Sequence, residues 1–174
     1  MRIPILLLAL LALAAPAAAA DGYRMEAYRA PVPAAAPGAE TVGLDAVRRL
    51  HADGGAVFID AVPATRHDLG DRMEWTRPEP RHNIPGSLWL PNIGYGALDP
   101  AVERWFRATL DTVTAERPGA ALLFYCQADC WMSWNAAKRA AAWGYGPVLW
   151  FPGGTDDWAA AGLPLVPAVP APWR

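Results

Sequence analysis

The sequence predicts an α/β protein whose core is an open parallel β-sheet with helices on both faces. Short segments such as 56–60 and 121–126 have the length of strands and carry apolar side chains at nearly every position. That pattern is typical of parallel strands that are buried on both faces. Segments with apolar residues at helical spacing lie between them, so the chain alternates strand and helix. This alternation favours a single parallel sheet.

The predicted elements lie between two segments rich in proline. In order, they are a helix over 41–52, strands at 56–60 and 87–90, a helix over 100–116, a strand at 121–126, a helix over 132–143, a strand at 148–151 and a short helix ending at 161. Gly54 and Gly144 stop two of the helices. Pro100 suits a first helical turn, and Thr155 suits the N-cap of the last helix.

The two ends of the chain predict one exported domain. Residues 1–20 combine one charge, an apolar run and a final Ala-Ala-Ala, which is the pattern of a cleaved signal peptide. Residues 21–40 form an arm or linker rich in alanine and proline, residues 41–166 form the domain, and residues 167–174 form a Pro-rich tail. We therefore expect a periplasmic protein with no membrane span once the signal peptide is removed.

The charge balance argues against a nucleic-acid partner. The chain has a formal net charge of −2, and Lys138 is its single lysine. A protein that binds nucleic acid or an anionic membrane surface usually carries a cluster of basic residues. No such cluster occurs in the sequence, so we expect neither kind of partner.

Cys126 and Cys130 are the only two cysteines of the sequence. An even number of cysteines in an oxidising compartment usually indicates a disulfide. A permanent bridge between them would close a very short ring, so it would add little stability through loop entropy. The sequence leaves two interpretations open, a structural bridge and a reactive pair.

Several separated motifs occur in a fixed order. They are Val57-Phe-Ile-Asp60, His82-Asn-Ile-Pro-Gly-Ser87, a strand that ends at Cys126, and Phe151-Pro-Gly-Gly-Thr-Asp-Asp-Trp158 followed by Gly162-Leu-Pro164. Together, over residues 41–166, they resemble a single rhodanese-like domain, the fold of sulfurtransferases. The resemblance implies that Cys126 stands where the nucleophile of that family stands.

A narrower resemblance rests on the segment from Phe124 to Arg139, which contains Cys-Gln-Ala-Asp-Cys-Trp. It is similar to a family of exported proteins named for a Cys-x-x-Cys-Trp motif and associated with pyrroloquinoline-quinone-dependent alcohol catabolism. In this chain three residues, rather than two, separate the cysteines. The resemblance implies a periplasmic protein partner, such as a quinoprotein dehydrogenase or one of its associated components. We expect no cofactor held by this chain.

The loop after Cys126 has the position expected of a reactive site. Ligands of open parallel sheets bind beyond the carboxyl ends of the strands, and a following helix N-terminus favours a thiolate. We expect Cys126 to be the nucleophile and Cys130 to resolve a persulfide, a sulfenate or a mixed disulfide. The backbone of residues 127–131 would form an anion cradle, with Trp131 as an aromatic wall. The loop and substrate-binding candidates are Gln127, Ala128, Asp129, Trp131 and Asp60.

The loop lacks the arginine that active sulfurtransferases and related phosphatases usually carry. Residues 127–132 contain no cation, and Asp129 adds an anion that would oppose a thiolate. Recognition of thiosulfate or phosphate requires charge-assisted donors. The sequence therefore argues against phosphatase activity and against efficient sulfur transfer from thiosulfate.

Other interpretations remain beside the reactive pair. The chain could be an inactive binding module that uses Trp131 and the polar segment 61–83 as a docking surface. A metal site made by the cysteines and His82 lacks regular ligand spacing, so we expect no metal. Asp60 could shape the loop, but a hydrogen bond to the following turn is the simpler role. We expect sulfur transfer or thiol–disulfide chemistry, accessory to quinoprotein alcohol oxidation.

Overall fold

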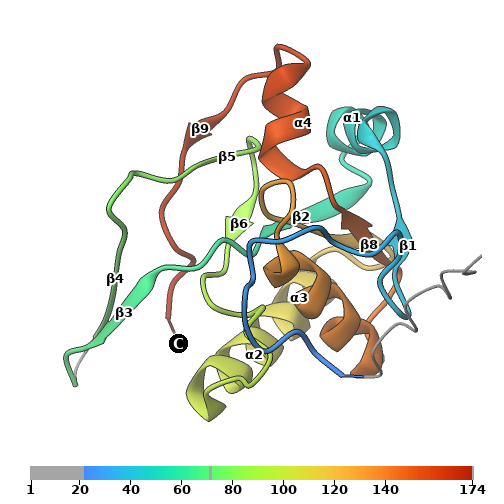
Figure 1. The fold of residues 1–174 in the computed structure, drawn as a ribbon. Helices are drawn as coiled ribbons and strands as arrows, with labels where there is room; N and C mark the ends of the chain where they lie inside the picture. Colours follow the sequence, from blue (N-terminus) through green and yellow to red (C-terminus); the bar gives the residue numbers. More distant parts are fainter. Residues whose placement is uncertain (1–21, 71, 174) are drawn as a thin grey trace, which may run out of the picture.

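The computed structural model describes residues 22–70 and 72–173, and the expected signal peptide lies outside them. Its centre is a five-stranded parallel sheet in the order β1-β8-β7-β2-β6, covered by helices on both faces (Figure 1). The strands are β1 (Glu40–Thr41), β2 (Ala56–Asp60), β3 (Thr65–Asp68), β4 (Met73–Thr76), β5 (His82–Asn83), β6 (Leu88–Trp89), β7 (Ala121–Tyr125), β8 (Val148–Phe151) and β9 (Val166–Pro167). The helices are α1 (Leu44–Asp53), α2 (Pro100–Glu116), α3 (Trp131–Ala142) and α4 (Gly154–Ala160). The predicted fold class is confirmed.

The central strands are buried along their whole length. Every residue of β2, β7 and β8 is buried, as the continuous apolar runs predict. Phe124 of β7 lies opposite Ile59 on one side and Trp150 on the other. Because the strands are parallel and in register, Asp60 and Tyr125 end side by side at one edge of the sheet.

Two helices cover each face of the sheet. The core on one face contains side chains from α2 and α3, and the core on the other contains side chains from α1 and α4. Asp99 caps α2 by accepting hydrogen bonds from the N–H groups of Ala101 and Val102. Gly54 ends α1 in the left-handed conformation, with φ of 65°.

The polar segment 61–83 contains strands that its sequence pattern does not predict. β3 and β4 pair as an antiparallel ribbon, and β5 pairs with β9 from the C-terminal tail. The expected cap by Thr155 is wrong. Gly153 is the N-cap of α4, and the Thr155 hydroxyl donates to the Cys126 carbonyl instead.

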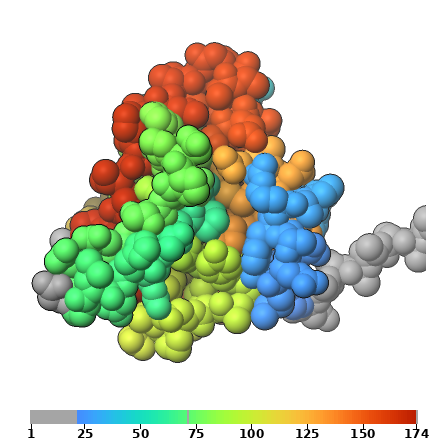
Figure 2. Space-filling model, turned by 60° about the vertical axis from the view of Figure 1, so that its left-hand side comes forward, coloured from blue at the N-terminus to red at the C-terminus, as the bar shows by residue number. Residues whose placement is uncertain are grey.

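Residues 22–39, which we call the N-terminal arm, lie over the sheet edge and α3. Figure 2 shows the arm in blue against the orange surface that includes α3. The Trp134 indole N–H donates to the Ala35 carbonyl at 2.8 Å, and Ala36 is buried. The arm is therefore packed against the domain. Across residues 22–70 and 72–173, no helix has the length and apolarity needed to cross a bilayer.

Candidate functional site

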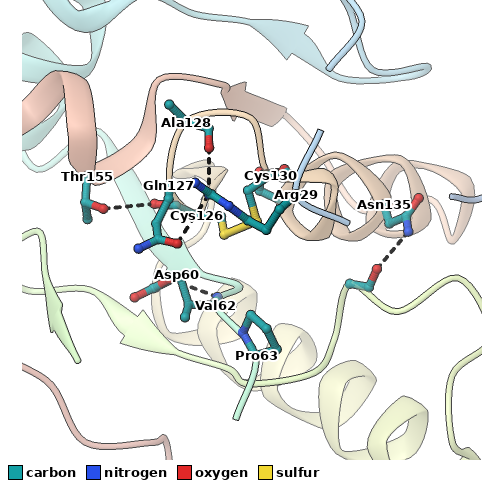
Figure 3. Close-up of a disulfide and its surroundings, with 12 residues drawn as sticks. Arg29, Asp60, Val62, Pro63, Cys126, Gln127, Ala128, Cys130, Asn135 and Thr155 are labelled. Carbon is teal, nitrogen blue, oxygen red and sulfur yellow. Dashed lines mark hydrogen bonds between the residues drawn. A yellow bond between two sulfur atoms is a disulfide. The ribbon is translucent and has the colours of Figure 1, made fainter. Parts of the chain in front are cut away.

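Cys126 and Cys130 form a disulfide at the carboxyl end of β7 (Figure 3). Cys126 is the first residue after that strand, and Cys130 is the N-cap of α3. Their Cα atoms are 6.2 Å apart. Cys126 is fully buried and Cys130 is 3% exposed. The bridge thus lies where the sequence places the reactive pair, but it is closed to solvent.

The segment 126–130, which we call the Cys loop, is bonded to the start of α4. The Cys126 carbonyl accepts hydrogen bonds from the Thr155 N–H at 3.0 Å and from the Thr155 hydroxyl at 3.3 Å. Gly154 has φ of 54°, and a Cβ there would lie 2.5 Å from the Cys126 carbonyl oxygen. Close approach of the two backbones therefore requires glycine at this position.

The loop itself makes a tight turn. Asp129 adopts the left-handed conformation with φ of 51°, which is uncommon for a residue with a side chain. The Asp156 carboxylate accepts a hydrogen bond from the Ala128 N–H at 3.2 Å. Asp156 lies in the first turn of α4, so a second carboxylate stands beside the loop in addition to Asp129.

The N-terminal arm packs over the Cys loop through Arg29. Arg29 forms an antiparallel bridge with Cys130, and its Nη1 donates to the Ala128 carbonyl at 2.7 Å and to the Gln127 Oε1 at 3.3 Å. Figure 3 shows Arg29 lying across the disulfide. The cation missing from the loop is therefore supplied by the arm. No local sequence pattern pointed to Arg29, which lies about 100 residues away in an irregular segment.

The predicted anion cradle is partly occupied by the protein itself. The Ala128 N–H is bound to Asp156, and the Trp131 N–H donates to the Tyr28 carbonyl at 2.9 Å. Two backbone donors in the segment 127–131 are therefore already used. The structure favours a loop that is closed by its neighbours over one that is open to a free anion.

Trp131 is not an open aromatic wall. Its indole N–H donates to the Pro31 carbonyl at 3.2 Å, and its ring contacts that of Trp134 at 5.1 Å between centroids. The Arg24 guanidinium lies over the Trp131 ring, 5.1 Å from its centroid. Trp131 is therefore half-covered by the arm.

Asp60 lies beside the Cys loop, but its carboxylate is engaged elsewhere (Figure 3). One oxygen accepts the Arg81 Nε–H at 2.7 Å, and the other accepts the Val62 N–H at 3.0 Å. Burial raises the pKa of Asp60, an effect that the charge of Arg81 opposes. The bond to Val62 is the expected hydrogen bond to the following turn, whereas no pattern in the sequence indicates the Arg81 partner.

His82 lies away from the cysteines. It is exposed in β5 and pairs with Pro167 of β9. Within the described parts of the chain, no three His, Cys, Asp or Glu side chains gather in the way a metal site needs.

A family model for the rhodanese-like domain matches residues 44–161, which include strands β2, β6, β7 and β8 of the central sheet, the four helices and the Cys loop. The chain belongs to the rhodanese-like domain family. In this rhodanese-like domain, Cys126 directly follows a central strand and the Cys loop leads into a helix. A search of the curated proteins finds no match.

Several solved structures resemble this rhodanese-like domain. Wild-type EanB is 19% identical, with a TM-score of 0.49, and the match covers 81% of this chain and 34% of EanB. The human single-domain sulfurtransferase TSTD1 is 25% identical, with a TM-score of 0.42 and coverage of 70% and 96%. A protein of unknown function from Rhodopseudomonas palustris, described as a possible tyrosine phosphatase, is 22% identical, with a TM-score of 0.45 and coverage of 73% and 84%. The chain spans about a third of the length of EanB.

Proposed function

We propose that this rhodanese-like domain performs thiol–disulfide exchange with a protein partner through Cys126 and Cys130. The observation that carries the proposal is the bridge between the end of the central strand and the N-cap of a helix. A thiol at a helix N-terminus has a lowered pKa, because the partial positive charge there favours the thiolate. A pair with one such thiol is suited to form and break its bridge.

The position of each cysteine suggests its role. The sequence alone predicts that Cys126 reacts first, whereas the location of Cys130 at the start of α3 leads us to propose the reverse order. Cys130 is the sulfur that forms the mixed disulfide with the partner. Cys126, buried at the end of β7, is the thiol that closes or releases the bridge.

The exchange is balanced within the two proteins. A thiolate of a partner dithiol attacks the Cys130 sulfur, the bridge breaks, and Cys126 leaves as a thiolate that takes up a proton. The second partner thiol then attacks the mixed disulfide and releases Cys130. Two electrons pass to this chain, which becomes a dithiol while the partner becomes a disulfide. A partner disulfide reverses the reaction.

The charges around the loop favour exchange over transfer from a small anion. Asp129 is part of the Cys loop and Asp156 is bonded to it, and both would repel thiosulfate or phosphate. Sulfur transfer is a second candidate, favoured by the guanidinium of Arg29 at the loop. It would release thiocyanate from thiosulfate and cyanide, and Arg29→Ala would reduce that release.

The biological setting is part of the same proposal. The expected signal peptide supports an oxidising, periplasmic location, where thiol–disulfide exchange has substrates. The Cys-x-x-x-Cys-Trp sequence supports a role accessory to quinoprotein alcohol oxidation, with a component of that system as partner.

The proposal is tested by trapping the exchange reaction. The variants Cys126→Ser and Cys130→Ser are each incubated with oxidised glutathione, and the double serine variant is the control. We expect the Cys126→Ser variant, which keeps Cys130, to form the mixed disulfide at least about tenfold faster than Cys130→Ser. Mass spectrometry of the intact chains measures both rates. Absence of a mixed disulfide in both single variants would contradict exchange.

A further inference from the structure

We infer that the surface of the Cys loop and α3 now covered by residues 28–31 of the N-terminal arm is the docking site for an extended polypeptide segment of the partner. This inference rests on the proposed function. It identifies the partner as a protein that presents a cysteine within an extended chain. In the resting molecule, the arm occupies the docking site.

The arm is paired with the Cys loop through backbone groups. The Ala30 N–H donates to the Asp129 carbonyl at 3.1 Å, and the Trp131 N–H donates to the Tyr28 carbonyl at 2.9 Å. These two bonds flank the antiparallel bridge between Arg29 and Cys130. Such pairing is the pattern by which proteins add an extended peptide to an exposed strand edge.

Side chains of α3 also bind the backbone of the arm. The indole N–H groups of Trp131 and Trp134 donate to arm carbonyls at 3.2 and 2.8 Å. The Asn135 amide bonds both the N–H and the carbonyl of Arg24, at 2.9 and 2.8 Å. Because these hydrogen bonds go to backbone atoms of the arm, an extended chain of another sequence could form the same bonds.

The arm must leave before exchange can occur. A thiolate attacks a disulfide in line with the sulfur–sulfur bond, and here Cys126 is fully buried and Cys130 is 3% exposed. Once the arm leaves, the polar groups of the loop and α3 lose their partners, and the buried Asn135 loses two hydrogen bonds. An extended backbone in place of the arm would restore these hydrogen bonds, so the opened surface offers a matching set of donors and acceptors to such a chain.

The geometry also selects the position of the incoming cysteine. The partner residue that takes the place of Arg29 lies opposite Cys130, the sulfur at the start of α3. Arg29 is exposed, so this position accepts another side chain without loss of packing. A small thiol such as glutathione lacks the length to replace the contacts from residue 24 to residue 35. A polypeptide thiol is therefore the substrate that fits this surface.

The chemical step is the same thiol–disulfide exchange, with the attacking thiolate on the partner residue that replaces Arg29. The partner cysteine thiolate attacks the Cys130 sulfur, Cys126 leaves as a thiolate and takes up a proton, and a second partner thiol then releases Cys130. The partner supplies both electrons and becomes a disulfide.

The first test opens the arm of the full chain. Ala30→Pro removes the N–H donor to Asp129, and Ala34→Pro is the matched control because Ala34 is exposed in the same arm. We expect dithiothreitol to reduce the disulfide of Ala30→Pro at least about tenfold faster than that of wild type, and the control to change less than about twofold. Reduction of the folded wild type and of folded Ala30→Pro at the same measurable rate would overturn the inference. Trp131→Phe keeps an aromatic ring but loses the indole N–H donor to Pro31, so we expect its disulfide to be reduced at a rate between those of wild type and Ala30→Pro.

The second test asks whether the backbone of a separate peptide binds to the surface that the arm leaves. The Ala30→Pro chain is mixed with a synthetic peptide of residues 24–36 carrying Arg29→Cys, and with the same peptide N-methylated at the Ala30 amide. We expect the unmodified peptide to form the mixed disulfide at Cys130 at least about tenfold faster, because only it can donate to Asp129. Equal rates would overturn the docking site and leave the exchange function standing. A bridge that resists dithiothreitol in Ala30→Pro until the domain unfolds would instead overturn the proposed function.

Discussion

Asp60 and Arg81 form a buried ion pair close to the Cys loop. Asp60 lies opposite Tyr125, the residue that precedes Cys126. The Arg81 side chain is 6% exposed and the Asp60 side chain is fully buried, with 2.7 Å between the charged atoms. A buried charge without its partner is strongly destabilising, because the desolvation of that charge is no longer compensated. The pair therefore joins the end of β2 to the segment that precedes β5.

Asp60→Asn tests the importance of this pair. The variant leaves the Arg81 charge buried without a counter-ion, so we expect a loss of about 3–5 kcal/mol in the free energy of unfolding. Urea unfolding followed by circular dichroism measures it. Glu103→Gln is the control, because it breaks an exposed pair with Arg107 on α2 and should cost less than about 0.5 kcal/mol. Similar small losses in both variants would contradict the assigned role of Asp60.

Neither Arg81 nor Arg29 could be assigned to the site from the sequence. The cysteines could, because a strand that ends in cysteine before a helix is a local pattern that places the side chain at the sheet edge. Arg29 contacts residues 98 and 99 positions away, and Arg81 contacts one 21 positions away. Such contacts depend on how distant parts of the chain come together in the fold, and no local sequence pattern indicates that arrangement.

At the level of elements, hydrophobic pattern predicted the buried structure well and the exposed structure poorly. β2, β7, β8 and α2 were predicted within one residue of their ends because burial imposes continuous or periodic apolar residues on them. The ribbon of β3 and β4 was missed. Its residues are mostly exposed or half-buried, and one strand reads Thr-Arg-His-Asp, so no apolar face distinguishes it from a polar loop.

Asp99 gives helix α2 a pH-dependent cap. Hydrogen bonds from Arg66 and from the Ala101 N–H lower the pKa of Asp99 from 3.8 to about 2. Because the folded pKa is lower than the unfolded one, the stabilisation is present above about pH 4 and is lost as the pH falls towards 2.

Asp99→Ala should lower the free energy of unfolding by about 1 kcal/mol at pH 7, since the cap is removed. The difference from wild type should shrink as the pH falls from 4 towards 2. Urea unfolding at pH 7, 4 and 2.5 measures this. Asp99→Asn retains a capping oxygen without a charge. The free energy of unfolding of this variant should therefore change less with pH than that of wild type over the same range. A difference that stays constant with pH would contradict the role of the Asp99 charge.

At the scale of the whole molecule, both terminal segments are built into the domain. The arm covers the Cys loop, and the tail pairs with β5 and brings Trp173 to Trp105 and Trp75. The centroids of Trp173 and Trp105 are 4.9 Å apart, and the Trp105 indole N–H donates to the Pro172 carbonyl. The tail therefore joins the β3–β4 ribbon to α2, although its composition resembles that of a linker.

Trp173→Ala should lower the free energy of unfolding by about 1–3 kcal/mol, because it removes an aromatic side chain that packs on two others. Far-ultraviolet circular dichroism in urea measures the loss without depending on tryptophan fluorescence. Val169→Ala is the control: Val169 is 82% exposed in the same tail, and we expect a change within about 0.5 kcal/mol. Equal effects of the two changes would mean that the aromatic contacts do not anchor the tail.

The reduction potential of the Cys126–Cys130 bridge tests the central claim most directly. The protein is equilibrated across a series of glutathione buffers, alkylated, and analysed by mass spectrometry. Exchange with a partner predicts a potential in the range of the known oxidoreductases, about −120 to −270 mV, with Cys130 alkylated before Cys126 after partial reduction. A potential below about −300 mV would mark the bridge as structural and contradict the account.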